Sequence, residues 1–265
     1  MTIALRPSYP TPEHAAAADA IVEHFAADYP VDAVLLVNSC ARGRATRDSC
    51  LDMAVLVRPE VLAPHRAAWE AEWERFDAAN STIRTLAKAG AYSVVHLDIV
   101  DGAFAPQERD EAAGPDDFEV EVGNRLAYSA PLWEGSDYYR SLQRHWLPYY
   151  GEELRRARLA MVRQYCLNNL HHIPLYVERG LYFQAFDRLY NAYREFLQGL
   201  FIARRTYPIA YNKWIHEQIV DILGLPELYA QLVRLFEIRH FESTEIADKA
   251  QVVEQLLQRY APADP

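Results

Sequence analysis

The sequence predicts an α+β fold, in which a small mixed sheet with flanking helices is followed by an all-helical bundle. Three short apolar runs in the first 100 residues, at 33–37, 50–57 and 92–100, are typical of buried strands. From about Ser136 onward, apolar residues recur instead at three- and four-residue spacing, which is typical of amphipathic helices. Because the period changes near residue 135, we expect two domains, residues 1–135 and 136–265.

The elements of the first domain follow one another along the chain. Thr11 and Pro12 predict the start of a helix that ends before Pro30. The strands at 33–37 and 50–57 enclose a small, polar, arginine-rich loop, and a charged helix at 64–89 leads to the strand at 92–100. Residues 105–121 are acidic and irregular, which predicts a solvated surface loop.

The second domain is predicted to be helical throughout. Prolines punctuate the helical pattern and are expected to end or begin helices. The predicted segments are 137–148, 151–172, 174–206, 211–223, 226–239 and 244–260, with Pro148, Pro174, Pro208 and Pro226 between or at the edges of them.

Composition excludes several classes of protein. The 265 residues are 51% hydrophobic and 24% charged, which is a globular composition, and the net charge of −10 argues against a nucleic-acid polymer as partner. No apolar run approaches the roughly 20 residues of a membrane span, and the first 14 residues lack the apolar core of a signal peptide. Three cysteines without a Cys-x-x-Cys pair fit a reducing compartment. We therefore expect a cytoplasmic protein with no membrane partner, and leave a homodimer open.

The stretch from Leu35 to Met53 carries the chemical signal. A buried strand delivers Asn38 and Ser39 to a tight turn, where free N–H groups and a hydroxyl can bind an anion. The following strand places positions 50 and 52 on one face, because strand side chains alternate. His96 and Asp98 share a face of the third strand by the same rule. Carboxylates that converge beside a phosphate site are the ligands that hard divalent metals prefer.

This pattern resembles the nucleotidyltransferases of the DNA polymerase β superfamily. Their signature is a strand, Gly-Ser, a short loop with Arg-Gly, then Ser-Asp-x-Asp on the next strand and another Asp on a later strand. The matching positions here are Ser39, Arg42, Gly43, Ser49 and Asp52, and Asp98 looks like the later acid. The match covers residues 33–57 well and residues 92–101 weakly. A small α/β unit followed by a helical bundle is similar to bacterial antibiotic nucleotidyltransferases of the kanamycin and lincosamide type.

The resemblance implies a nucleotidyltransferase that moves a nucleoside monophosphate from a nucleoside triphosphate, with ATP expected, to a hydroxyl of a small-molecule acceptor. Mg²⁺ is the implied cofactor, and Asp52 and Asp98 are the implied catalytic acids that hold it, with Cys50 at a third ligand position. The implied phosphate-binding residues are Ser39, Arg42, Gly43 and Ser49.

Two positions depart from the signature. Asn38 replaces the first glycine, and Asn tolerates a positive φ better than other residues with a side chain, so the turn can survive. Cys50 replaces the first acid of the Asp-x-Asp pair, and a thiol is a poor Mg²⁺ ligand.

Three alternatives follow from the cysteine at position 50. The site uses one metal ion held by Asp52 and Asp98, or Asp48 reaches in as a substitute acid, or metal-dependent transfer has been lost. In the last case the chain is a nucleotide-binding or regulatory module, such as one that pairs with a helical partner in a toxin–antitoxin system. A redox-sensitive site formed by Cys40 and Cys50 is a further, weaker hypothesis.

The helical half adds two candidates. Asp187, Asn191 and Glu195 fall on one helix face, and Glu195 is the candidate base for an acceptor hydroxyl, although an exposed polar stripe has the same pattern. Lys213, one of only three lysines, lies between aromatic residues, and the resemblance implies that it approaches the triphosphate. The neighbouring His171 and His172 are interpreted as structural.

Overall fold

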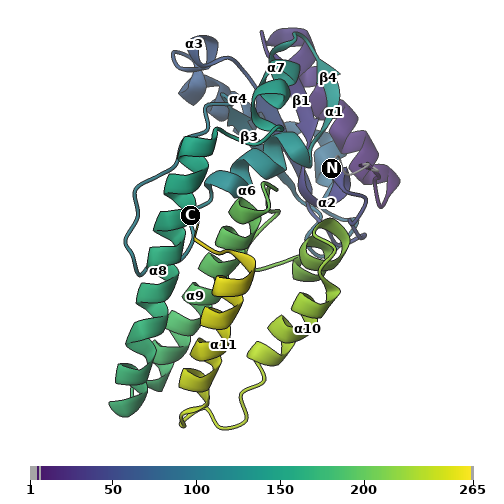
Figure 1. The fold of residues 1–265 in the computed structure, drawn as a ribbon. Coiled ribbons are helices and arrows are strands. Elements are labelled where there is room, and N and C mark those ends of the chain that lie inside the picture. Colours follow the sequence, from purple (N-terminus) through teal and green to yellow (C-terminus); the bar gives the residue numbers. More distant parts are fainter. Residues whose placement is uncertain (1–4, 6, 264–265) are drawn as a thin grey trace. The chain divides into compact units, whose positions relative to one another are not determined.

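The chain folds into two compact units over the part that the structure describes. The structure is a computed structural model that describes residue 5 and residues 7–263 (Figure 1). Unit 1 contains the described residues up to Ala105 together with Glu121–Pro148. Unit 2 contains Pro106–Val120 and the described residues from Tyr149 onward. The predicted boundary after residue 135 falls inside unit 1, and a short excursion at 106–120 belongs to unit 2 instead.

Unit 1 contains a small mixed sheet with flanking helices. Its described strands are β1 (Ala33–Leu36), β2 (Leu51–Leu56), β3 (Val95–Val100) and β4 (Ala130–Glu134). They lie in the order β3-β2-β1-β4, with β1 antiparallel to both β2 and β4, and β2 parallel to β3. The predicted α+β class and the three predicted strands are confirmed.

Strand β4 was not predicted from the sequence. This strand lies at an edge of the sheet and pairs with β1, with a register irregularity between Val34 and Leu35. Its five residues include Pro131, which cannot donate to a ladder and is tolerated in strands mainly at sheet edges. A short strand that contains proline has no alternating pattern by which it could be found.

Several helices surround the sheet of unit 1. A single helix was predicted over 64–89, but the chain breaks at Asn80, whose side chain accepts hydrogen bonds from the N–H groups of Thr82 and Ile83 and so begins a new helix. The helices are α1 (Pro12–Asp28), α2 (Asn38–Ala41), α3 (Pro59–Leu62), α4 (Arg66–Ala79), α5 (Ser81–Leu86) and α7 (Tyr138–Trp146), with a π-helical turn at Gly123–Ala127.

The core of unit 1 lies around the two central strands. Every residue of β1 and β2 is buried, which explains their nearly continuous apolar sequences. Helix α1 packs against the sheet and against α5 and buries Ile21 and Phe25 there. This packing fixes β2, which carries Asp52, and β1, which leads to the Asn38–Ser39 turn.

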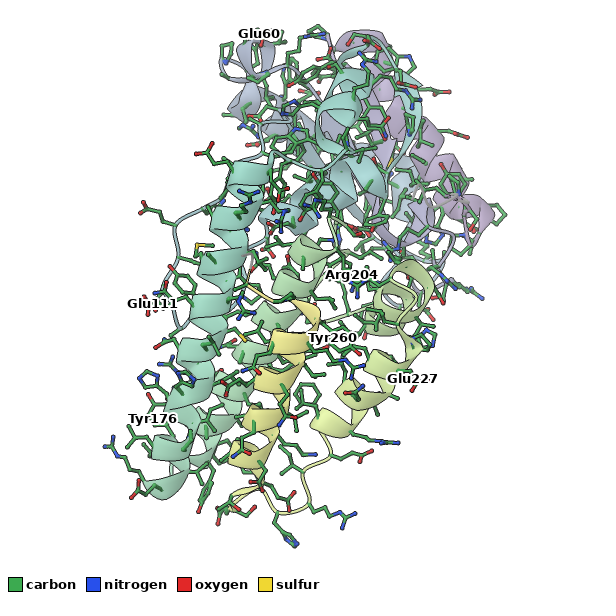
Figure 2. All side chains as sticks on the ribbon, viewed as in Figure 1. Glu60, Glu111, Tyr176, Arg204, Glu227 and Tyr260 are labelled. Atoms are coloured by element: carbon green, nitrogen blue, oxygen red, sulfur yellow. The ribbon has the colours of Figure 1, made fainter. Side chains whose placement is uncertain are left out.

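Unit 2 is a helical bundle, as predicted. Helices α8 (Glu152–Glu178) and α9 (Tyr182–Ala203) pack along each other, and α11 (Glu245–Tyr260) packs against both. Helix α10 (Pro226–Leu235) packs against α11 and against a π-helical turn at Glu217–Ile222, while α6 (Phe118–Val122) joins the two units in the chain. Figure 2 labels Tyr176 on α8 and Tyr260 at the end of α11.

Helix α8 continues through Pro174, where the sequence predicted a break. An interior proline typically costs a helix about 3 kcal/mol, because it removes a hydrogen bond and crowds the preceding turn. Leu170 and Ile173 are buried before it, and Val177 packs against the same core after it. Burial of such side chains contributes about 1.5–3 kcal/mol each, which offsets the cost of the proline.

The 106–117 segment has no regular secondary structure, but the prediction of a solvated surface is wrong for several of its charges. Asp116 and the Arg109 side chain are buried, as is Glu119 in α6. Arg158 of α8 donates to Glu119 Oε1 at 2.5 Å and to Asp116 Oδ1 at 2.7 Å, and Gln198 of α9 donates to Glu119 Oε2 at 2.9 Å. Asp116 and Glu119 are buried because α8 supplies the opposite charge, whereas Glu108, Asp110, Glu111 and Asp117 are exposed, as predicted.

Among the helices of the described residues, none is both long and apolar enough to cross a membrane.

Candidate functional site

The end of β1 and the starts of β2 and β3 lie together at one end of the unit 1 sheet, next to the predicted site residues. Because β1 runs antiparallel to β2, the end of β1 lies beside the start of β2, and the parallel strand β3 starts at the same edge. The Val37 N–H, directly after β1, donates to the Asp52 carbonyl at 3.0 Å. The Asn38–Ser39 turn is therefore joined to the strand position that carries Asp52.

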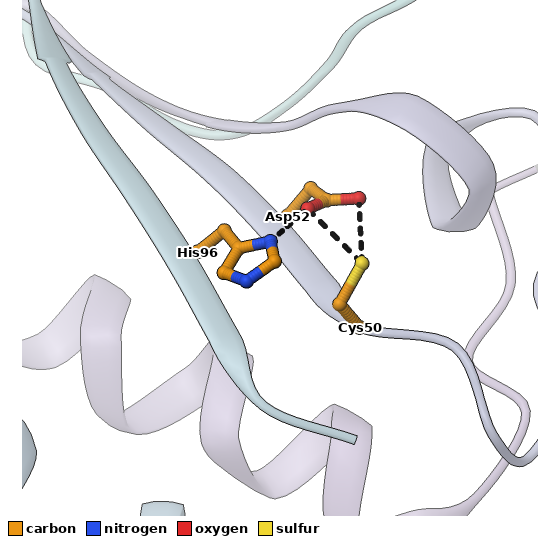
Figure 3. Close-up of side chains that lie close together, drawn as sticks. All are labelled: Cys50, Asp52 and His96. Atoms are coloured by element: carbon orange, nitrogen blue, oxygen red, sulfur yellow. Dashed lines mark hydrogen bonds and ion pairs between the residues drawn. The ribbon is translucent and has the colours of Figure 1, made fainter. Parts of the chain in front are cut away.

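Three side chains converge at this edge (Figure 3). The Cys50 thiol donates to both carboxylate oxygens of Asp52 at 3.3 Å, and His96 Nδ1 lies 3.2 Å from Asp52 Oδ1. The Asp52 side chain is 12% exposed and that of His96 is 64% exposed. One ligand atom from each residue lies within 4.8 Å of the others, so Cys50, Asp52 and His96 together could hold a metal ion.

The structure brings Cys50 and Asp52 together as expected, but it places His96, and not Asp98, opposite Asp52. In the parallel register, Asp52 pairs with His96 and Ala54 pairs with Asp98. Asp98 lies two residues further along β3, roughly 7 Å from the level of Asp52. Its carboxylate, 59% exposed, forms an ion pair with Arg125.

The turn after β1 contains two residues in the left-handed region of backbone conformation. Asn38 has φ of 55°, in the left-handed region, and it begins the short helix α2. The prediction that Asn38 tolerates a positive φ is therefore confirmed. Ser39 and Arg42 are buried beside this turn, and Gly43 follows with φ of 69°.

Two side chains of the loop that joins α2 to β2 accept backbone hydrogen bonds, one from within the loop and one from the 90–91 turn. Ser49 Oγ accepts a hydrogen bond from the Thr46 N–H at 2.9 Å, so this predicted phosphate-binding hydroxyl also closes its loop. Asp48 Oδ1 accepts from the Ala91 N–H at 2.9 Å. That bond directs Asp48 to the 90–91 turn, and the metal-binding group of the described residues does not include it.

Cys40 lies beside the three side chains without joining them. Its thiol contacts the Cys50 carbonyl oxygen at 3.9 Å, and both residues are thiols without a disulfide bond. Burial, together with the nearby Asp52 and Cys50, raises the pKa of Cys40 to about 12. Cys40 therefore stays protonated at neutral pH and is not a reactive thiolate, and the group of described residues that could hold a metal ion does not include it.

Glu195, the predicted base, lies in unit 2 and is completely buried. Asn169 donates to its Oε2 at 2.9 Å, and an Arg109 nitrogen lies 3.9 Å from its Oε1. Burial raises the pKa of Glu195 to about 7, although the Asn169 hydrogen bond and nearby arginines lower it in part. Its helix face contacts the 106–117 segment, since Asn191 donates to the Ala112 carbonyl at 3.2 Å.

Lys213 also lies in unit 2, where it is exposed. It precedes the helical turn that was predicted to contain it, and its carbonyl accepts a hydrogen bond from Gln218 at 3.0 Å. The two histidines of α8 have separate structural partners: His171 lies 3.9 Å from Glu254, and His172 Nδ1 lies 2.7 Å from the Asn168 carbonyl.

His96 is the member of this cluster to which the sequence alone gave no functional role. The alternation in Val95–Val100 placed His96 and Asp98 on the same face, and only the pairing register decides which of them meets Asp52. A histidine on one strand, together with a cysteine and an aspartate two residues apart on a neighbouring strand, is the pattern that could have indicated a mixed-donor metal site.

Comparisons with protein-family models, with curated proteins and with solved structures found no match to this chain.

Proposed function

We propose that unit 1 is a nucleoside-triphosphate-binding module with a nucleotidyltransferase-like architecture. The observation that carries this proposal is the left-handed Asn38, which begins a helical turn directly after β1 and beside Asp52. A strand followed by such a turn presents backbone N–H groups and the Ser39 hydroxyl to an anion. Arg42, buried next to the turn, supplies positive charge for a phosphate.

Mg²⁺, the metal that the resemblance implies, does not fit the donors at this site. Mg²⁺ requires near-octahedral coordination by hard oxygen ligands. Of the three converging side chains, only Asp52 supplies oxygen, whereas Cys50 supplies sulfur and His96 supplies nitrogen. We therefore derive no metal-dependent transfer step at this site, and the binding function is the proposal that the donor set supports.

Nucleotidyl transfer is the second candidate, and Asp52 favours it. A carboxylate is costly to bury, and this one lies at the position that the signature reserves for an acid. In that reaction an acceptor hydroxyl attacks the α-phosphorus of a nucleoside triphosphate, forms an ester with the nucleoside monophosphate and releases pyrophosphate. Glu195 and Lys213 belong to unit 2, and the proposal assigns them no role.

Calorimetric titration with ATP, with and without Mg²⁺, tests the binding proposal. We expect measurable heat, and about 10- to 150-fold weaker binding for Arg42→Met, because a charge-assisted hydrogen bond contributes about 1.5–3 kcal/mol. Arg44→Met is the matched control, since Arg44 is exposed on the same loop, and its affinity should change little. Absence of heat at millimolar nucleotide would refute the proposal.

Pyrophosphate release separates the two candidates. With ATP, Mg²⁺ and an added polyol whose hydroxyls act as acceptor, a binding module releases no pyrophosphate, and the double variant Cys50→Asp, His96→Asp should gain release because it places oxygen ligands around Asp52. Release by the wild-type protein that is lost in Asp52→Asn would instead establish transfer.

A further inference from the structure

The cluster of Cys50, Asp52 and His96 has a donor chemistry of its own. Thiolate sulfur, imidazole nitrogen and one carboxylate oxygen are the ligand atoms that Zn²⁺ takes in proteins, and Zn²⁺ commonly binds such mixed sets. We infer that these three residues form a site for Zn²⁺ or a similarly borderline divalent ion, and not for Mg²⁺. The inference does not depend on the proposed nucleotide binding.

The spacing of the donor atoms agrees with a tetrahedral centre. Zn–O and Zn–S bonds of about 2.0 and 2.3 Å at a tetrahedral angle place oxygen and sulfur about 3.5 Å apart, and Zn–O and Zn–N bonds place oxygen and nitrogen about 3.3 Å apart. The Cys50 sulfur lies 3.3 Å from each Asp52 oxygen, and His96 Nδ1 lies 3.2 Å from Oδ1. These two spacings therefore need to change little when an ion enters, and the three ligand atoms all lie within 4.8 Å of one another.

The strands hold these side chains in place before any ion binds. Asp52 lies on β2 directly opposite His96 on β3, and Cys50 lies immediately before β2. The Leu51 N–H, between Cys50 and Asp52, donates to the Val94 carbonyl at 2.9 Å. Ligands fixed on neighbouring strands lose little conformational entropy when they bind an ion.

The charges of the site also favour a divalent ion. A Cys50 thiolate beside the Asp52 carboxylate would place two negative charges 3.3 Å apart, and in the structure the thiol proton separates them. Zn²⁺ would take the place of that proton, and its two positive charges would balance the thiolate and the carboxylate while His96 binds as neutral imidazole.

The site leaves one coordination position for a ligand from solution. Zn²⁺ sites with three protein ligands usually bind water or a substrate in the fourth position, whereas structural sites have four protein ligands. Among the described residues, the metal-binding group has only these three members. Since the His96 side chain is 64% exposed, the fourth position faces solvent, where water or a phosphate oxygen can bind.

Metal titration of tag-free, metal-stripped protein tests the inference. We expect one Zn²⁺ per chain in competition with a chromophoric chelator, and no displacement by a large excess of Mg²⁺. Co²⁺ should give the visible absorption of a tetrahedral centre and a near-ultraviolet thiolate-to-cobalt band. The band is a direct signature of Cys50, because Cys40 and Cys166 are buried thiols outside the cluster.

Ligand variants and matched controls locate the ion. Cys50→Ser, Asp52→Asn and His96→Gln should each weaken Zn²⁺ binding by about 100-fold or more, since loss of a group that only orients a ligand already costs about 10–100-fold. The matched controls are Cys40→Ala, Asp98→Asn and His172→Gln, which remove the same chemical groups outside the cluster and should keep wild-type affinity.

Two results would overturn the inference. One is wild-type protein that binds Zn²⁺ no more tightly than Mg²⁺, and the other is Cys50→Ser protein that keeps both the affinity and the cobalt band. Circular dichroism verifies that each variant is folded. If one variant does not fold, the wild-type cobalt spectrum still shows whether a thiolate ligates the ion. The ATP titration is a separate measurement, so its failure leaves the metal result intact.

Discussion

Glu195 makes the stability of the helical unit depend on pH. Burial raises its pKa from the ordinary 4.5 to about 7, so between these values the folded protein holds a proton that the unfolded chain releases. Since the folded state binds more protons in this window, the free energy of unfolding falls as the pH rises from 4.5 to 7. The loss is complete above the folded pKa and absent below the unfolded one.

The size of the effect follows from the shift. One pKa unit corresponds to about 1.4 kcal/mol, so the rise of the Glu195 pKa from 4.5 to about 7 corresponds to about 3 kcal/mol. The Asn169 hydrogen bond and the charges of Arg109, Arg188 and Arg194 all stabilise the charged carboxylate and are already included in that value. Burial outweighs them because the side chain has no exposed surface.

Glu195→Gln isolates this contribution, because glutamine cannot titrate and its amide oxygen can still accept the hydrogen bond from Asn169. We expect the unfolding free energy of the wild type, minus that of the variant, to fall by about 3 kcal/mol as the pH rises through this window. Urea denaturation followed by circular dichroism at a series of pH values measures the difference.

The matched control is Glu178→Gln, which changes an exposed glutamate on α8 and should leave the wild-type pH profile intact. Identical pH profiles for the wild type and Glu195→Gln would refute the assignment, and so would a difference that grows in the opposite direction.

Three further measurements test the fold and the site. Arg158→Met should lower the free energy of unfolding by about 3–5 kcal/mol, because it leaves two buried carboxylates without their arginine partner. Arg156→Met, on the exposed face of α8, should change the free energy of unfolding little. Equal losses for the two variants in urea denaturation would contradict the stabilising role of Arg158. Asn38→Val should lower the free energy of unfolding by about 1–2 kcal/mol, and Asn38→Gly should leave it unchanged, because φ of residue 38 is 55°. Equal stability of the two variants in thermal unfolding would be inconsistent with a left-handed turn. Zn²⁺ at 100 times its dissociation constant should stabilise the wild type by about 2.7 kcal/mol and raise its melting temperature, whereas a similar rise in Cys50→Ser would exclude Cys50 as a ligand.

The sequence was sufficient for the elements with a strong local signal. The apolar runs at 33–37 and 50–57 became the fully buried strands β1 and β2, and the run at 92–100 became β3, which buries Ile99. Asn38 adopts a positive φ, which asparagine tolerates. The helical pattern after residue 136 was equally clear. In each case the pattern lies within a few neighbouring residues.

The errors concern contacts between residues that lie far apart in the sequence. Asp98 was expected beside Asp52, but register places His96 there, and no local pattern encodes the register of two parallel strands. Asp116 and Glu119 were interpreted as solvated, because their partner Arg158 belongs to another element. Helix α8 passes through Pro174 because residues of α9 and α11 cover its apolar face.

The donor set decides which metal ions the cluster suits. Cys50 and His96 both face the Asp52 carboxylate, at 3.3 and 3.2 Å. Neither side chain supplies oxygen, and sulfur and imidazole nitrogen are the softer ligands that favour Zn²⁺ over Mg²⁺. The sheet supplies convergent positions for three side chains, and the atoms at those positions decide which metal, and therefore which chemistry, the protein can support.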